Sequence, residues 1–97
     1  MNLLMQRSGQ KNNMDKNLAE FVVCSPFELY YSTGGHGGPH MSWPVAWDAA
    51  NRLLDGNVNE KWIDIVSRNT HSAFRVVKKT GGDTELQISP RNYKRRK

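Results

Sequence analysis

Residues 42–56 read SWPVAWDAANRLLDG and contain the strongest helix pattern in this chain of 97 residues. Apolar side chains recur along the segment at steps of three and four, and polar side chains occupy the opposite positions. Ser42 suits an N-cap, Pro44 falls in the first turn, and Gly56 suits a left-handed C-terminal cap. The pattern predicts an amphipathic helix over residues 43–55. Its apolar positions are Trp43, Ala46, Trp47, Ala50, Leu53 and Leu54.

Three segments with strand patterns follow the helix. Residues 62–66 are apolar on both faces apart from Asp64, which favours a central strand. Residues 73–79 and 84–88 alternate between apolar and polar side chains, and a Gly81-Gly82 pair lies between them. A glycine pair between two alternating segments is typical of a hairpin turn. We therefore expect a three-stranded meander after the helix.

The segments before the helix are less regular. Residues 21–24 form a short run with strand propensity, and Pro26 separates it from residues 27–31, so we expect two short strands or one kinked strand there. Alternate residues of the second run share one face, which leaves Tyr30 on the other face. Residues 32–40 are rich in glycine and contain no hydrophobic anchor, so we expect a flexible surface loop there.

Together these segments predict an α+β fold, in which one amphipathic helix packs across a small antiparallel sheet of about four or five strands. A chain of this length forms one domain. We expect a flexible N-terminal arm over residues 1–16, the domain over residues 17–90, and a basic tail over residues 91–97.

The net positive charge lies at the C-terminus. Residues 1–90 contain nine Lys and Arg against nine Asp and Glu, so the formal net charge of +5 comes from the last seven residues. A cationic tail on a neutral domain favours a polyanionic partner. The leading hypothesis is a small nucleic-acid-associated protein that contacts the phosphate backbone. Its candidate contacts are Arg91, Lys94, Arg95, Arg96 and Lys97 in the tail, and Arg75, Lys78 and Lys79 in the strand before the glycine hairpin.

An alternative function is protein interaction. A compact module of this size, of the kind that phages and mobile elements encode, can bind and modulate a larger host protein or complex. In that case the glycine-rich segment and an exposed tyrosine would form the interface, and the tail would steer association toward an acidic surface. The candidate contacts are then Tyr30, Gly35, His36, Gly37 and His40.

Catalytic and metal-binding patterns are weak in this sequence. No Gly-x-Ser-x-Gly motif is present, and Asp64 has two possible ion-pair partners, Arg68 and Arg75, instead of a catalytic role. His36 and His40 are four residues apart in the glycine-rich segment, where they lack the second ligand pair of a zinc site. We therefore expect no enzyme activity, no metal and no cofactor.

Cysteine content and hydropathy bear on the cellular compartment. Cys24 is the only cysteine, which excludes a disulfide within the chain. The sequence begins without a signal-peptide pattern, and no apolar run approaches the roughly 20 residues of a membrane span. These observations predict a cytoplasmic protein that makes no membrane contact.

Overall fold

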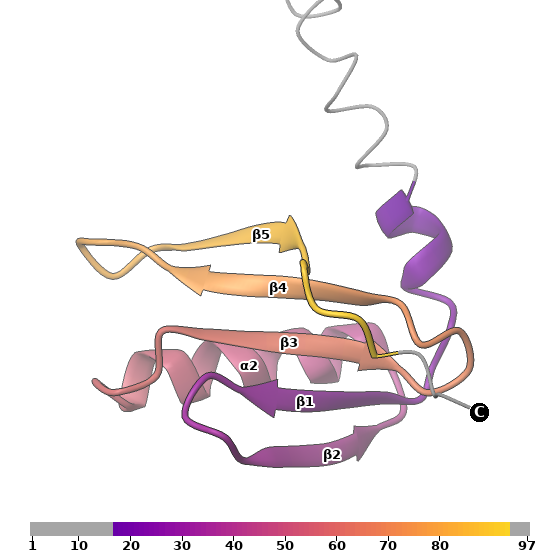
Figure 1. The fold of residues 1–97 in the computed structure, drawn as a ribbon, viewed down its shortest axis with the longest axis horizontal. Coiled ribbons are helices and arrows are strands. Elements are labelled where there is room, and N and C mark those ends of the chain that lie inside the picture. The colour runs from indigo at the N-terminus through magenta and orange to yellow at the C-terminus, as the bar shows by residue number, and fades with distance from the viewer. Residues whose placement is uncertain (1–16, 94–97) are drawn as a thin grey trace, which may run out of the picture.

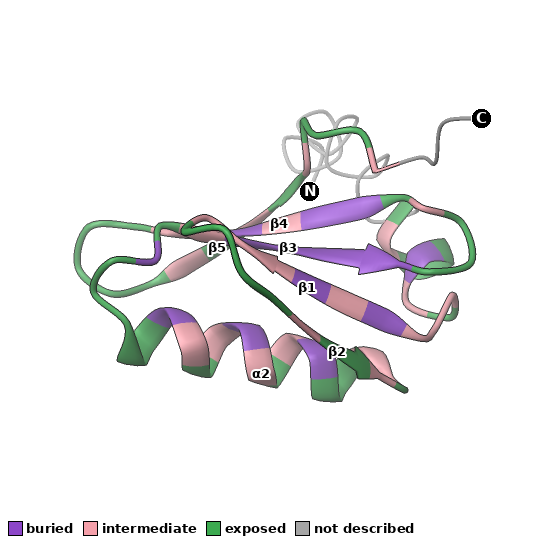
Figure 2. Ribbon diagram, turned by 60° about the horizontal axis from the view of Figure 1, so that its bottom comes forward, coloured by how far each residue is buried: buried purple, intermediate pink, exposed green. Residues whose placement is uncertain are grey.

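The predicted α+β fold is confirmed in a computed structural model, which describes residues 17–93. Five strands form one antiparallel sheet in the order β2-β1-β3-β4-β5, and the helix α2 lies across one face of it (Figures 1 and 2). We call this face the inner face and the opposite one the outer face. The elements are β1 (Phe27–Tyr31), β2 (His36–His40), α2 (Trp43–Gly56), β3 (Trp62–Ser67), β4 (Ala73–Lys78) and β5 (Thr84–Ile88).

The helix begins where the sequence predicts and ends differently. Ser42 is the N-cap residue, although its side chain makes no capping hydrogen bond, and Pro44 lies in the first turn. The expected left-handed cap at Gly56 is wrong, because Gly56 is the last helical residue and Asn57 follows in an extended conformation. The Asn57 carbonyl accepts hydrogen bonds from the Glu60 backbone and the Lys78 ammonium group.

The core lies between α2 and the inner face of the sheet. Ala46, Ala50 and Leu54 are the buried residues of α2 and match the predicted apolar stripe. Trp43 and Trp47 lie on the same stripe but are only partly buried. The strands contribute Phe27 and Leu29 from β1, Ile63 and Ile65 from β3, and Phe74 and Val76 from β4. Because β3 pairs with both β1 and β4, its prediction as a central strand is confirmed.

The strand expected over residues 21–24 is wrong. Residues 17–21 are helical, and a turn leads from them to β1. The helical geometry directs the Phe21 ring into the end of the core, where it packs against three aromatic rings at centroid distances of 4.8 to 5.7 Å. These aromatic contacts outweigh the strand propensity of the sequence around Phe21.

The flexible loop expected over residues 32–40 is also wrong, because its second half forms the edge strand β2. The position of the Tyr31 ring accounts for the glycines in this segment. A Cβ atom added at Gly35 would lie 3.1 Å from that ring. One added at Gly37 would lie 2.3 Å from the Tyr31 hydroxyl oxygen. Gly38 has a φ of +103° and lies close to the Phe27 carbonyl, where a side chain would be strained. The glycines therefore let β2 approach β1 closely.

The remaining turn follows the sequence prediction. Gly81 and Gly82 both have positive φ values and connect β4 to β5. The Lys79 amide donates to the Asp83 carbonyl across this turn, which closes the hairpin. Within residues 17–93, no helix is both long and apolar enough to cross a membrane.

Candidate functional site on the outer face of the sheet

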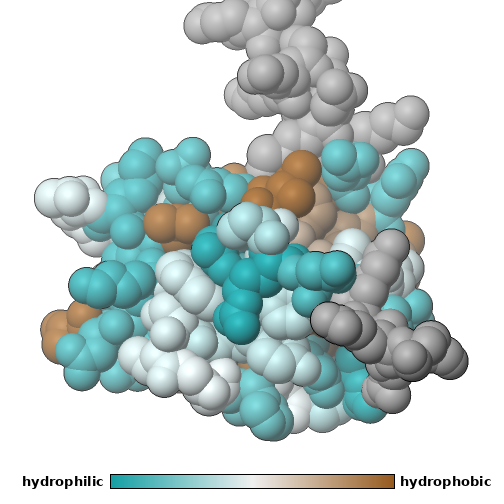
Figure 3. All heavy atoms as spheres, viewed as in Figure 1, coloured by the Kyte–Doolittle hydropathy of each residue, from teal (hydrophilic) through white to brown (hydrophobic). Residues whose placement is uncertain are grey.

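The outer face carries no helix in the part of the chain that the structure describes. After β5 the chain turns back and crosses in front of β4 and β3 (Figure 1). The outward-pointing residues of the central strands include Tyr30 of β1, Trp62 and Asp64 of β3, and Arg75 of β4. Figure 3 shows hydrophilic side chains gathered over the middle of this face, beside side chains of intermediate hydropathy. The outer face therefore combines aromatic and charged residues.

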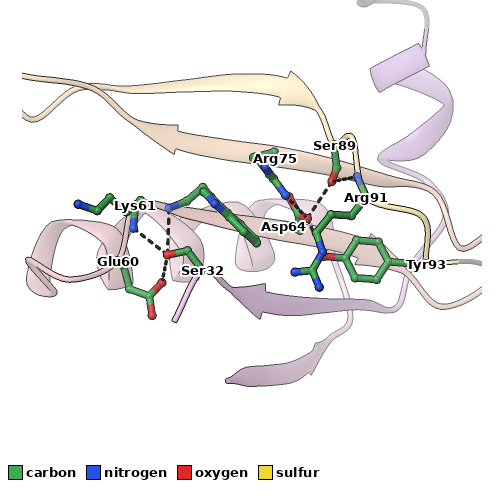
Figure 4. Close-up of polar contacts among 9 residues, drawn as sticks. Ser32, Glu60, Lys61, Asp64, Arg75, Ser89, Arg91 and Tyr93 are labelled. Atoms are coloured by element: carbon green, nitrogen blue, oxygen red, sulfur yellow. Dashed lines mark hydrogen bonds and ion pairs between the residues drawn. The ribbon is translucent and has the colours of Figure 1, made fainter. Parts of the chain in front are cut away.

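Asp64 is the centre of this face and is fully buried. Arg75 binds it through two nitrogen atoms, with an Nε–Oδ1 distance of 2.8 Å and an Nη2–Oδ2 distance of 3.1 Å. The Ser89 and Tyr93 hydroxyls donate to Oδ2 at 2.8 and 2.6 Å (Figure 4). The structure thus selects Arg75 over Arg68 as the partner of Asp64. Two of the four hydrogen bonds come from the chain after β5, so Asp64 anchors that segment to the sheet.

Two tyrosines of the outer face are held by carboxylates. The pKa of Tyr93 is raised by burial, by its hydrogen bond to Asp64 and by the negative charge of that carboxylate. The Tyr30 hydroxyl donates to Glu28 at 3.1 Å, and burial together with this bond raises the pKa of Tyr30. Both phenols are therefore neutral hydrogen-bond donors at physiological pH.

Aromatic rings and guanidinium groups form a continuous row across the outer face. The ring of Tyr30 lies 5.8 Å from that of His36 and 4.9 Å from that of Tyr93, measured between centroids. The Arg91 guanidinium lies 5.5 Å from the Tyr93 ring and 5.6 Å from the Trp62 ring. Arg75 stacks on Trp62 at 3.6 Å. We call this set the outer-face row, and its members are His36, Tyr30, Tyr93, Arg91, Trp62 and Arg75.

A second carboxylate secures the turn between β1 and β2. Glu60 is 5% exposed and accepts hydrogen bonds from the hydroxyls of Ser32, at 2.7 Å, and Thr33. The Ser32 hydroxyl oxygen also accepts from the Lys61 backbone at 2.8 Å (Figure 4). Burial raises the pKa of Glu60, but the hydrogen bonds from Thr33 and Ser32 outweigh it, so the pKa is lowered overall. Glu60 therefore holds the hairpin as an anion and fixes β2 beside β1.

The predicted phosphate contacts have different surroundings. Arg91 is exposed, whereas the Arg75 side chain is only 13% exposed and is bound to Asp64. Lys78 donates to the Asn57 carbonyl, and Lys79 forms an exposed ion pair with Glu85. The structure therefore separates Arg75 and Arg91, on the outer face, from the lysines near the β4–β5 turn. Lys94, Arg95, Arg96 and Lys97 lie outside the described residues.

The residues predicted for a protein contact do not form one surface. Tyr30 and His36 pair across β1 and β2 and both belong to the outer-face row. Gly35 and Gly37 instead lie against the Tyr31 ring, and His40 pairs with Phe27 at the other end of β2. Three further residues of this face were not among the predicted contact residues. These are Trp62, Ser89 and Tyr93.

The described chain also contains at least two clefts. A cleft of about 680 Å³ lies between the helical residues 17–21, the end of β5 and the segment that follows it. Cys24 and His71 are among its lining residues, together with part of Tyr93. Within residues 17–93, no group of three or more His, Cys, Asp or Glu side chains is arranged to hold a metal ion.

The chain was compared with protein-family models, with curated proteins and with solved structures. None of them matches it.

Proposed function

We propose that this protein binds nucleic acid through its basic C-terminal segment and the outer face of the sheet. The observation that carries the proposal is the anchoring of Tyr93 to Asp64 by a 2.6 Å hydrogen bond. Four consecutive cations follow Tyr93 in the sequence. Their point of attachment therefore lies on the outer face, next to the exposed Arg91. A cationic segment that begins beside an exposed arginine suits an extended polyanion.

The carboxylates near this segment do not oppose phosphate binding. Asp64 is neutralised by the bidentate contact with Arg75. Glu28 forms an ion pair with Arg68 at 3.5 Å and accepts the Tyr30 hydroxyl. The Arg91 guanidinium lies near two aromatic rings, and the residue is exposed to solvent. The charge available to a partner on this face is therefore positive.

The proposed binding is electrostatic and only weakly dependent on sequence. No element of the described chain has the form of a helix that reads the major groove, because α2 lies against the sheet. If Arg91 and the four cations after Tyr93 each neutralise one phosphate of a duplex, log K falls with log salt with a slope of about −4.5. With a single cysteine in the chain, we propose the reducing cytoplasm as the compartment.

A truncation after residue 93 tests the proposal. This truncation removes Lys94, Arg95, Arg96 and Lys97 and keeps the contacts of Arg91 and Tyr93, so Asp64 stays satisfied. Fluorescence anisotropy with labelled oligonucleotides over a salt series measures affinity and slope. We expect weaker binding and a duplex slope smaller in magnitude by about 3.6, from four lost contacts.

The matched control keeps the chain length. A full-length variant with glutamine at positions 94–97 removes the same charges without removing residues. It should behave like the truncation if charge is responsible. Affinity that is unchanged in both variants would contradict the role proposed for the C-terminal segment.

The start of α2 favours protein binding as a second candidate function. Met41 is 70% exposed and Val45 is 52% exposed, and they lie near the half-buried Trp43. Exposed apolar side chains near a large aromatic residue are typical of a protein contact. A partner from a host extract whose capture is lost with Met41→Asp and Val45→Asp would support this function. Capture that is insensitive to both substitutions would contradict it.

A further inference from the structure

We infer that the nucleic acid is single-stranded and that its unpaired bases stack on the outer-face row. This inference rests on the proposed function and names the class of nucleic acid. The row crosses the sheet from β2 through β1 and β3 to β4, because His36, Tyr30, Trp62 and Arg75 come from these four strands in that order. Tyr93 and Arg91 reach the row from the segment after β5.

The members of the row retain accessible surface although they contact one another. His36 and Arg91 are exposed, and Tyr30, Trp62 and Tyr93 are half-buried. By contrast, the three phenylalanines of the inner-face core, Phe21, Phe27 and Phe74, are nearly or fully buried. The rings of the outer face are therefore available to a ligand, whereas those three phenylalanines serve the core.

Ring faces and guanidinium planes recognise unpaired bases better than paired ones. In a duplex the bases stack on each other, so a protein reaches only their edges in the grooves and the phosphates outside. An unpaired base exposes its flat face and can stack on tyrosine, tryptophan, histidine or arginine. The outer face offers several such groups side by side, and α2 lies on the opposite face of the sheet. Its chemistry therefore matches a single strand.

The charges on this face complement the backbone of such a strand. Arg91 lies between the rings of Tyr93 and Trp62, where a base that stacks on either ring brings its phosphate close to the guanidinium. Arg68 is 53% exposed and is paired with Glu28, the carboxylate that accepts the Tyr30 hydroxyl. Arg91, at the Tyr93 end of the tyrosine pair, is therefore the cation of this face that can neutralise a phosphate of a strand crossing the row.

The test compares single-stranded and duplex oligonucleotides with variants of the row. Fluorescence anisotropy measures binding of 20-nucleotide oligothymidine, oligouridine and a DNA duplex of equal length to the full chain at moderate salt. We expect tighter binding of the single strands. Tyr30→Leu should weaken single-strand binding about 5- to 100-fold, which corresponds to the loss of one stacked base. Duplex binding should change less than twofold, because it depends on phosphate contacts.

Two control variants separate stacking from folding. Tyr30→Phe keeps the ring and removes only the hydroxyl, so single-strand affinity should stay close to that of the unmodified protein. His36→Leu changes an exposed residue of an edge strand and should weaken single-strand binding without unfolding the protein, which circular dichroism checks. If both Tyr30→Leu and His36→Leu bind single strands normally, the inference is wrong.

Indole fluorescence gives an independent readout of stacking. A base that stacks on Trp62 quenches its emission, and Trp62→Phe should remove that part of the quenching while it preserves a ring for the base. Quenching of equal size in Trp62→Phe would place the bases elsewhere and contradict the inference.

The outcomes distinguish this inference from the proposed function. Salt-sensitive binding that depends on residues 94–97, with equal affinity for duplex and single strand, would keep the proposed function and overturn the stacking inference. Absence of binding to every oligonucleotide at low salt would overturn both. Equal affinity for oligothymidine and oligouridine would show that the sugar is not read, as expected for base stacking and phosphate contacts alone.

Discussion

Asp64 and Ile65 are adjacent in β3, and both are fully buried, but they lie on opposite faces of the sheet. Ile65 packs in the apolar core under α2, where burial of carbon surface provides the stability. Asp64 lies on the outer face, where four hydrogen bonds from three side chains surround its carboxylate. One face of this sheet is therefore stabilised by packing and the other by a polar network.

The two kinds of burial respond differently to change. An apolar core loses stability in proportion to the volume removed, because the neighbours keep most of their contacts. A buried ion pair fails abruptly, because removal of one partner leaves the other charge without compensation. The outer face is thus the more fragile of the two, and the C-terminal segment depends on it.

The largest expected effect is the loss of the central carboxylate. Asp64→Ala leaves the Arg75 guanidinium and two hydroxyls without their acceptor, and it should lower the free energy of unfolding by about 3–5 kcal/mol. Urea unfolding measures this change. The exposed Asp48–Arg52 pair is the matched control, and Asp48→Ala should cost about 0.5 kcal/mol or less. Equal losses of stability in both variants would mean that the buried Asp64 contributes no more to the free energy of unfolding than the exposed Asp48 does.

A smaller effect is expected from Tyr93→Phe, which removes one bond to Asp64 and keeps the ring. It should cost about 1.5 kcal/mol, as for a hydrogen bond to a charged group. Because the pKa of Tyr93 is raised above 10.0, the folded state holds this proton more tightly than the unfolded state does. The contribution of the hydroxyl is complete below pH 10 and is lost as the pH rises further. A stability difference between the two proteins that persists undiminished well above pH 10 would refute this.

Ile65→Val tests the inner face with a change of one methylene group. The remaining side chain keeps its contacts with the core, so the expected cost is about 1 kcal/mol. Thermal or urea unfolding measures it, and oligonucleotide binding should be unaffected because the outer face is unchanged. A loss as large as that of Asp64→Ala would remove the distinction between the two faces.

The smallest expected effect concerns Glu60, a carboxylate held by hydroxyls without an arginine partner among residues 17–93. Glu60→Gln should cost about 0.5 kcal/mol at pH 7, because a charge-assisted hydrogen bond becomes a neutral one. Since the pKa of Glu60 is lowered from 4.5, its contribution is complete above pH 4.5 and is lost as the pH falls below that value. The difference in stability between the two proteins should therefore shrink as the pH falls below 4.5, as measured by urea unfolding. A difference of constant size down to pH 3 would contradict the assigned role.

The parts of the fold with strong periodicity could be predicted from the sequence. The helix over Trp43–Gly56 and the three strands after it repeat their apolar residues often enough to show which face is buried. The helical segment of residues 17–21 is too short to show a period of 3.6 residues, and the sequence around Phe21 has strand propensity. The strand β2 could not be predicted from its glycine-rich sequence, because the role of those glycines depends on the Tyr31 ring of the neighbouring strand.

The candidate site could be predicted only in part. The outward position of Tyr30 follows from alternation along β1, and the strand pattern left Asp64 with two possible partners. The contact between Tyr93 and Asp64 joins residues 29 positions apart, through a segment without periodicity, so no local pattern indicates it. Tyr93 lies among cations in the sequence, but that pattern does not indicate a contact with the sheet. Its attachment to the sheet required the three-dimensional arrangement.

The two edges of the sheet differ in a way that limits self-association. The pairing of β2 with β1 has a register shift between Phe27 and Leu29, and Pro39, the fourth residue of β2, has no N–H group to donate to another strand. Such interruptions prevent an edge strand from serving as a template for aggregation. β5 has neither feature within Thr84–Ile88, so its backbone pattern is regular. Copies of this protein that join strand to strand would therefore meet through β5, and growth of the sheet would stop at β2.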